Sequence, residues 1–123
     1  MCHYLLPEDT GKGRAATRND TRYADNAMRS LVRSIKKAGT CAQDYQVGLF
    51  GGGNMFTSLE KSWSVDVGSR NIAAGYQLVR ECGFTVAYED LGGKLHRQII
   101  LDLVDGTLHL RRGTERTLVF PAL

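Results

Sequence analysis

Apolar residues between Tyr23 and Ala38 recur at intervals of three and four, which is the spacing of one face of an α-helix. The positions that share this face are Ala24, Ala27, Met28, Leu31, Val32 and Ile35. Asp20 or Thr21 is expected to cap the start of the helix, and Gly39 is expected to end it. The pattern therefore predicts a first helix over residues 23–38.

The same spacing returns between Arg70 and Cys82. The apolar positions here are Ile72, Tyr76, Val79 and Cys82. Ser69 is a suitable N-cap, and Gly83 is a suitable stop. A second helix is therefore predicted over residues 70–82.

Short runs of apolar and β-branched residues predict strands between and after the helices. Residues 46–50 and 84–88 are two such runs. Residues 97–104 and 107–111 flank Asp105-Gly106, which is a strong signal for a hairpin turn. The order of elements predicts one α/β domain with two main helices and at least one antiparallel hairpin.

Composition and charge narrow the class of protein. The chain has 123 residues, of which 42% are apolar and 24% charged, and its net charge is +3. Its basic residues are scattered along the chain, which does not favour nucleic-acid binding. No apolar run is long enough for membrane insertion. Three cysteines without a paired motif favour a reducing compartment, so we expect a cytoplasmic protein.

Gly51-Gly52-Gly53-Asn54 follows a predicted strand, at a place where a phosphate-binding loop would also lie. A P-loop needs GxxxxGK[ST] and a dinucleotide loop needs GxGxxG, and neither pattern is present. The glycines instead favour a tight turn or close backbone packing. The apolar pair Met55-Phe56 that follows is either a docking anchor or part of the core.

The chain has three histidines, of which His109 is expected to be solvent-exposed and His96 to lie in a loop. His3 is either a core residue, as a histidine among apolar residues more often is, or a group that transfers protons near neutral pH. None of the three has the spacing of a metal site, so neither a metal nor a cofactor is expected. His3 stands in the short apolar run 3–6, which Pro7 stops and which is typical of the end of a strand. Cys2 is expected to be a packing residue, because neighbouring side chains on a strand point to opposite faces and would keep it from pairing with His3.

Glu89-Asp90-Leu91-Gly92-Gly93 places two acids and two glycines at the end of a predicted strand. One interpretation is the rim of an active site, because functional residues favour loops. The other is an exposed turn whose acids pair with Arg97 or nearby arginines. The residues alone leave both open.

The order of these motifs resembles the chemoreceptor glutamine deamidase family (CheD), from His3 to about Arg112. The residues that carry the resemblance are His3-Tyr4-Leu5-Leu6-Pro7, Tyr23-Ala24-Asp25, Leu49-Phe50-Gly51-Gly52-Gly53-Asn54-Met55-Phe56, Val67-Gly68-Ser69-Arg70-Asn71 and Glu89-Asp90-Leu91-Gly92-Gly93. The resemblance implies a deamidase domain over residues 1–112 and a C-terminal tail over residues 113–123. The implied fold is an α/β sandwich of a mostly antiparallel or mixed sheet with two main helices, similar to that of toxin deamidases.

The same resemblance implies a protein-glutamine glutaminase that acts on methyl-accepting chemotaxis receptors and uses no metal. A cysteine thiolate, activated by a histidine, would attack the glutamine carboxamide. His3 matches the family's histidine. Some family members also bind a chemotaxis phosphatase. The residues expected at the surface that meets the substrate or partner are Gly51, Gly52, Asn54, Phe56 and Glu89.

The family's nucleophile lies in a Gly-Ser-Cys turn upstream of this histidine, and in this chain that turn would precede Met1. Either the start is placed too late or the product is truncated. The first account is favoured, because loss of the strands that pair with residues 2–6 would expose apolar surface and a sheet edge. We therefore expect the 123-residue chain alone to be inactive and poorly soluble. The alternative function is a non-catalytic module that binds the phosphatase or a receptor.

Overall fold

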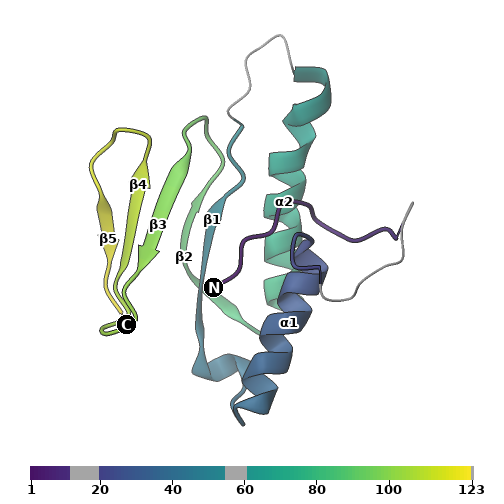
Figure 1. The fold of residues 1–123 in the computed structure, drawn as a ribbon, viewed down its shortest axis with the longest axis vertical. Coiled ribbons are helices and arrows are strands. Elements are labelled where there is room, and N and C mark those ends of the chain that lie inside the picture. Colours follow the sequence, from purple (N-terminus) through teal and green to yellow (C-terminus); the bar gives the residue numbers. More distant parts are fainter. Residues whose placement is uncertain (12–19, 55–60, 123) are drawn as a thin grey trace.

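The computed structural model describes residues 1–11, 20–54 and 61–122, without the side chains of residues 61–66. The elements within these ranges are α1 (Ala24–Lys37), the 3₁₀ helix η1 (Ala42–Asp44), β1 (Gln46–Gly51), α2 (Lys61–Glu81), β2 (Thr85–Leu91), β3 (Arg97–Leu101), β4 (Leu108–Arg112) and β5 (Leu118–Phe120). β1 and β2 form a parallel pair, and β3, β4 and β5 form an antiparallel sheet in that order. Figure 1 shows β1 and β2 between the two α-helices and the antiparallel sheet. The expected α/β fold with two main helices and mixed strand directions is confirmed.

Both helices end at the predicted glycines. At the end of α1, the Gly39 N–H donates to Lys36 O at 3.0 Å. The Thr40 N–H donates to Ile35 O, also at 3.0 Å. These two bonds form a Schellman motif, which satisfies carbonyls that the last helical turn leaves open. α2 ends with the same pair of bonds around Gly83.

The start of α1 differs from the prediction that Asp20 or Thr21 caps it. The N-cap residue is Tyr23, whose side chain makes no capping hydrogen bond. The Ala24 N–H, at the first helical position, donates instead to Leu6 O at 2.8 Å. A main-chain carbonyl of the N-terminal segment thus takes the place of a capping side chain.

The prediction for the second helix was too short. α2 begins at Lys61 rather than at Arg70, so Ser69 lies inside the helix and does not cap it. Ser69 is a residue type that often caps helices, and glycine lowers helix propensity, so the local pattern did not indicate a helix through Gly68. The helix continues through Gly68, which packs against the glycine loop after β1.

The two faces of the β1–β2 pair meet different neighbours. Leu49 pairs with Glu89, and Phe50 pairs with Asp90. Because side chains alternate along a strand, these two pairs point to opposite faces. The Leu49 side chain lies against α2 at Gly75, so Leu49 and Glu89 face the helix. Phe50 and Asp90 face the antiparallel sheet.

β5 lies in the segment 113–123, which was expected to be a tail. It pairs with β4, and its Phe120 ring lies 5.9 Å from the Phe50 ring and 5.1 Å from the Tyr88 ring, between centroids. The Tyr88 hydroxyl donates to Pro121 O at 2.7 Å. Aromatic packing therefore joins the two sheets. The domain boundary at residue 112 stays a prediction.

β3 and β4 form the hairpin that Asp105-Gly106 predicted, with Arg97 opposite Arg112 at its open end. The first strand ends at Leu101 rather than at residue 104. The Asp102 N–H donates to Thr107 O at 2.8 Å, which closes the loop. The turn is therefore wider than a two-residue hairpin.

Residues 3–6 do not form the predicted strand end. Leu6 makes a single parallel bridge with Tyr23, and His3 is exposed. The Leu5 and Leu6 N–H groups both donate to Arg22 O, at 2.7 and 3.0 Å. The segment is therefore held by main-chain bonds to Arg22, without a neighbouring strand among the described residues.

Few apolar side chains are buried in the described part of the chain. The residues concerned are Ala24, Ala27, Val79 and Leu110. None of the described helices has the length and apolar character needed to cross a membrane.

Candidate functional site

The glycine loop after β1 lies in direct backbone contact with α2. A Cβ added to Gly52 would lie 2.4 Å from Ile72 Cγ1, and one added to Gly68 would lie 2.6 Å from Gly52 O. Such distances leave no space for a side chain at either position. Gly52 also has a φ of +65°, a conformation that glycine adopts readily. The interpretation of this loop as a close-packing element is therefore confirmed.

The N-terminal segment docks on the same helix, next to the loop contact. Tyr4 Oη donates to Asn71 O at 2.7 Å, and Asn71 Nδ2 donates to Leu5 O at 2.9 Å. Figure 1 shows this segment, in purple, passing across α2. The contacting helix positions are Gly68, Asn71, Ile72 and Gly75. They are spaced as one helix face, which we call the α2 stripe. It brings the segment that carries His3 and the loop that carries Gly52 to one surface.

The loop after β2 pairs with the glycine loop. The Gly92 N–H donates to Gly51 O, and the Asn54 N–H donates to Gly93 O, each at 2.8 Å. The two loops that sequence motifs singled out are thus joined by main-chain hydrogen bonds. Gly51 and Asn54 lie at this junction. Phe56, the other predicted residue of the first loop, lies outside the described residues.

The guanidinium of Arg97 makes hydrogen bonds to both loops. Its Nε donates to Asp90 Oδ1 at 2.7 Å, its Nη2 to Gly92 O at 2.7 Å and its Nη1 to Gly51 O at 3.4 Å. Only 8% of the Arg97 side chain and 13% of the Asp90 side chain are exposed. Arg112 adds a second positive charge, 3.6 Å from Asp90 Oδ2. The prediction that an acid of this motif pairs with Arg97 is confirmed for Asp90.

Glu89 lies within β2 rather than in a turn, and its side chain faces α2. It is exposed and accepts a hydrogen bond from the Tyr76 hydroxyl. This hydrogen bond raises the pKa of the Tyr76 phenol, since loss of the proton would place two negative charges together. Glu89 is therefore held on the helix side of the sheet.

His3 makes no hydrogen bond or ion pair with the described residues, and its surroundings leave the imidazole exposed. Cys2 is also exposed, so the expectation that it packs inside was wrong. The reason is that residues 2–6 do not enter a sheet. Partial desolvation raises the pKa of the Cys2 thiol, which disfavours the thiolate.

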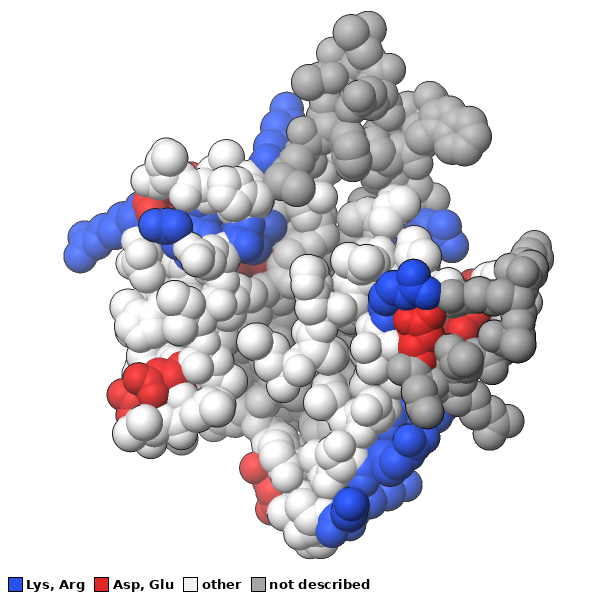
Figure 2. All heavy atoms as spheres, in the orientation of Figure 1, with Lys and Arg blue, Asp and Glu red and all other residues white. Residues whose placement is uncertain are grey.

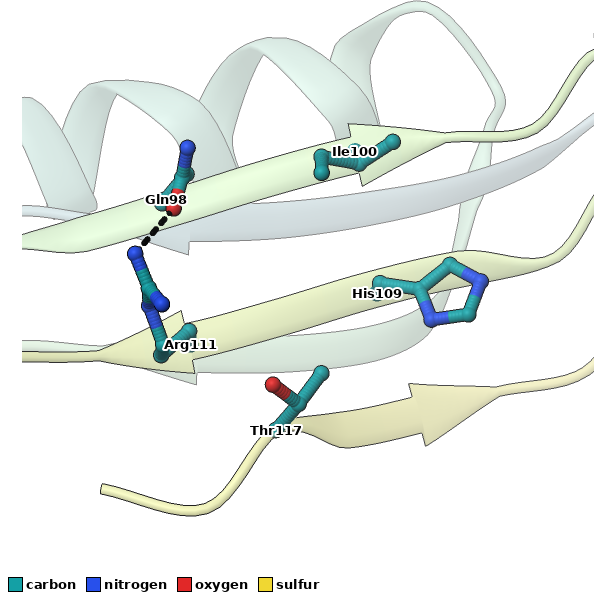
Figure 3. Close-up of a pocket in the computed structure, with 5 residues that line it drawn as sticks. All are labelled: Gln98, Ile100, His109, Arg111 and Thr117. Atoms are coloured by element: carbon teal, nitrogen blue, oxygen red, sulfur yellow. Dashed lines mark hydrogen bonds between the residues drawn. The ribbon is translucent and has the colours of Figure 1, made fainter. Parts of the chain in front are cut away.

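The outer face of the antiparallel sheet carries a separate, shallow pocket of about 110 Å³. Figure 3 shows side chains from β3 and β4, together with Thr117, surrounding it. Its lining residues are Gln98, Ile100, His109, Arg111 and Thr117. None of the predicted site residues is among them. Across the described residues, no group of three His, Cys, Asp or Glu side chains could hold a metal ion.

Basic side chains are divided over the surface. Figure 2 shows separate groups of Lys and Arg, one of them along α1, with wide uncharged surface between them. The α1 group consists of Arg29, Arg33, Lys36 and Lys37. On this face, the basic residues are thus scattered in space as well as along the sequence.

Sequence reasoning missed the α2 stripe, because it began the helix at Arg70. A signal was present, since Gly68, Asn71 and Gly75 stand at i, i+3 and i+7, and small residues at this spacing allow close approach to a helix face. The hydrogen bonds that Arg97 donates to the Gly51 and Gly92 carbonyls were also missed. No local pattern predicts a bond across 46 positions of sequence, as between Arg97 and Gly51.

The fold and these contacts define an α/β domain in which one helix supports a paired glycine-loop surface. The family model described as CheD chemotactic sensory transduction matches residues 5–112. The chain is 37% identical over 119 residues to the probable chemoreceptor glutamine deamidase CheD 1 of Chromobacterium violaceum, covering 96% of this chain and 60% of the relative. It is 40% identical over 112 residues to the probable chemoreceptor glutamine deamidase CheD of Pseudomonas fluorescens, covering 90% and 62%.

A third relative is the probable chemoreceptor glutamine deamidase CheD of Methanococcus maripaludis, 37% identical over 115 residues, covering 94% of this chain and 71% of the relative. The chain belongs to the CheD family. It spans 60% and 62% of the length of the first two relatives. The family match begins at residue 5, so it does not include His3.

Proposed function

We propose that this protein is a chemoreceptor glutamine deamidase, which converts glutamine side chains of methyl-accepting chemotaxis receptors to glutamates. The observation that carries the proposal is the family match over residues 5–112, with relatives named for this activity. The α2 stripe supports it, because it holds the His3 segment and the glycine loop on one surface. Gly51, Gly52, Asn54, Phe56 and Glu89 are proposed to form the surface that meets the receptor.

In the proposed reaction His3 is the general base. It takes the proton of a cysteine thiol, and the thiolate attacks the carboxamide carbon of the substrate glutamine. The imidazolium then gives its proton to the amide nitrogen as the C–N bond breaks, so that ammonia leaves and a thioester between the cysteine and the substrate remains. The neutral imidazole next activates a water molecule, which hydrolyses the thioester and leaves a glutamate. No metal or cofactor takes part in these steps.

The nucleophile is assigned to a Gly-Ser-Cys segment N-terminal to His3, outside the 123 residues. Burial raises the pKa of the Cys82 thiol and partial desolvation raises that of Cys2, whereas a nucleophile needs a low pKa. In addition, none of the three cysteines, Cys2, Cys41 and Cys82, follows a Gly-Ser pair, which supports placing the nucleophile upstream. The N–H groups of Asn54 and Gly92 already bond to the facing loop, so donors for an oxyanion would be other main-chain groups.

The proposal places the protein in the cytoplasm. Its three cysteines are all free, which suits a reducing compartment. The proposed partners are the receptors and, as a second partner, a chemotaxis phosphatase.

Site-resolved mass spectrometry of a receptor's cytoplasmic fragment tests the activity. The enzyme would be the protein extended by the residues encoded upstream of the Met1 codon. We expect it to convert selected glutamines to glutamates and to release ammonia. A variant with the upstream cysteine changed to alanine should not do so. Failure of the extended protein to convert any glutamine would contradict the proposal.

A non-catalytic binding module is the second candidate, and the lack of a Gly-Ser-Cys turn among the 123 residues favours it for this chain taken alone. It predicts that this chain retains the phosphatase or a receptor fragment in a pull-down without converting glutamine. A Phe56→Ala variant tests whether Phe56 anchors the partner. Equal retention by both forms would remove Phe56 from the contact surface.

A further inference from the structure

The main chain of Leu5 and Leu6 is held from two sides. From the side of α1, Arg22 O accepts both of their N–H groups, at 2.7 and 3.0 Å. From the side of α2, Asn71 Nδ2 donates to Leu5 O at 2.9 Å. The second contact joins residues 66 positions apart, and it is a side-chain bond that one substitution removes.

Tyr4 adds a second bond to the same place. Its hydroxyl donates to Asn71 O at 2.7 Å. Gly75, one turn further along α2, leaves the space for this hydroxyl, because an added Cβ would lie 2.7 Å from Tyr4 Oη. The helix face between Asn71 and Gly75 is thus shaped to receive the N-terminal segment.

Only the amide nitrogen of the Asn71 side chain makes a hydrogen bond within the described part of the chain. Asn71 Oδ1 is buried and has no hydrogen-bond partner within the described part of the chain. A buried oxygen without a donor is unfavourable, so other contacts must hold this side chain in place. The bond to Leu5 O is the contact that does so.

His3 itself makes no hydrogen bond to the described residues, so its position follows from the backbone beside it. We propose that Asn71 is a positioning residue for His3, fixing together with Tyr4 the segment that carries the histidine against α2. This inference rests on the proposed function, in which His3 is the general base. Asn71 acts through the segment and does not touch the substrate.

Amide hydrogen exchange in the 123-residue chain tests the anchor without any activity. Asn71→Ala removes the donor to Leu5, and Tyr4→Phe removes only one hydroxyl and keeps the ring. Each should speed exchange of the Leu5 and Leu6 amides by about tenfold or more, because the anchored state opens more often. Gln77→Ala is the matched control, since Gln77 lies on the same helix and bonds only Glu81 among the described residues.

Kinetic measurements on the extended protein test whether Asn71 affects catalysis by His3. A displaced general base should lower kcat by about 10- to 100-fold in Asn71→Ala, with KM and the melting temperature close to wild type. Unchanged exchange in both anchor variants, or equal changes in Gln77→Ala, would overturn the inference. So would a kcat that stays at the wild-type value while exchange is faster. If the wild-type protein shows no deamidation, the proposed function fails, and the exchange result alone decides whether the anchor exists.

Discussion

Arg97 buries its guanidinium beneath the two glycine loops, with 8% of its side chain exposed, and faces an Asp90 carboxylate that is 13% exposed. It also donates to the carbonyls of Gly51 and Gly92. A charge in such a place is favourable only when its partners are all present. One side chain therefore determines how two loops from different strands meet.

Replacing Arg97 by alanine should lower the free energy of unfolding by about 3 kcal/mol, because Asp90 would keep only the more distant Arg112. Urea denaturation measures this change. The matched control is Arg111→Ala on the exposed outer face, where a change within about 0.5 kcal/mol is expected. Equal losses in the two variants would contradict the role given to Arg97.

Asp90 and Asn71 show how far single residues could be predicted. The pairing of Asp90 with Arg97 was one of two open interpretations, because the two are only seven positions apart. The spacing of Asn71 with Gly68 and Gly75 indicated a shared helix face but not a partner, since Leu5 is 66 positions away and belongs to a segment without secondary structure. Roles that depend on long-range contacts do not appear in local patterns.

At the scale of elements, Gly68 tests whether the close contact between α2 and the glycine loop matters. Gly68→Ala gains helix propensity worth about 1 kcal/mol. The new methyl group would lie 2.6 Å from Gly52 O, however, and overpacking of this kind costs about 1–3 kcal/mol. We therefore expect a lower melting temperature, measured by circular dichroism. A more stable Gly68→Ala variant would show that the loop is free to move away.

Ser69→Ala is the neighbouring control and also tests where α2 begins. If Ser69 capped the helix, its loss would cost about 1 kcal/mol. Inside an exposed helical turn, alanine should be neutral or slightly stabilising. Thermal unfolding distinguishes the two, and a clear loss of stability would place the helix start at residue 70.

The β3–β4 turn contributes a pH-dependent element. Asp105 Oδ1 accepts the Thr107 N–H at 2.8 Å, which lowers the pKa of this carboxyl in the folded state. The contribution of Asp105 to the free energy of unfolding is therefore complete above the ordinary carboxyl pKa of about 3.9. It is lost as the pH falls through the lower pKa of the folded state. Asp105→Asn keeps an acceptor but does not titrate, so its urea midpoint should fall less on acidification. Parallel pH profiles of the two proteins would contradict this.

Elements with local signals were predicted well. The first helix, both helix ends and the hairpin depend on spacing, glycine stops and Asp105-Gly106, all of which lie within a few residues. The start of α2 and the conformation of residues 3–6 depend on tertiary packing. Gly68 lies within α2 and packs against the glycine loop, and the N-terminal segment bonds to Arg22 and Asn71 instead of a strand.

At the scale of the whole molecule, the outer face of the antiparallel sheet leaves apolar side chains uncovered. Ile100 is 58% exposed and Val119 is 56% exposed, beside the exposed loop residues Leu103 and Val104. Exposed apolar patches next to strand edges favour association. We expect the 123-residue chain to associate increasingly with concentration.

Size-exclusion chromatography with light scattering would measure this association. The double variant Ile100→Lys with Val119→Lys should stay monomeric at concentrations where the wild type associates. Gln98→Lys, on the same face, adds charge without removing apolar surface and should change the behaviour less. A wild type that is monomeric throughout would contradict the role assigned to this face.

We propose that this CheD-family fold holds His3 in position to act as the base in glutamine deamidation. The most direct measurement is kcat for a receptor fragment, with the extended wild-type protein compared with its His3→Gln variant, both verified as folded by their melting curves. Loss of a general base should lower kcat by about 10²- to 10⁴-fold, with conversion at the same glutamines where it can still be detected. A His3→Gln variant that deamidates at nearly the wild-type rate would contradict the account.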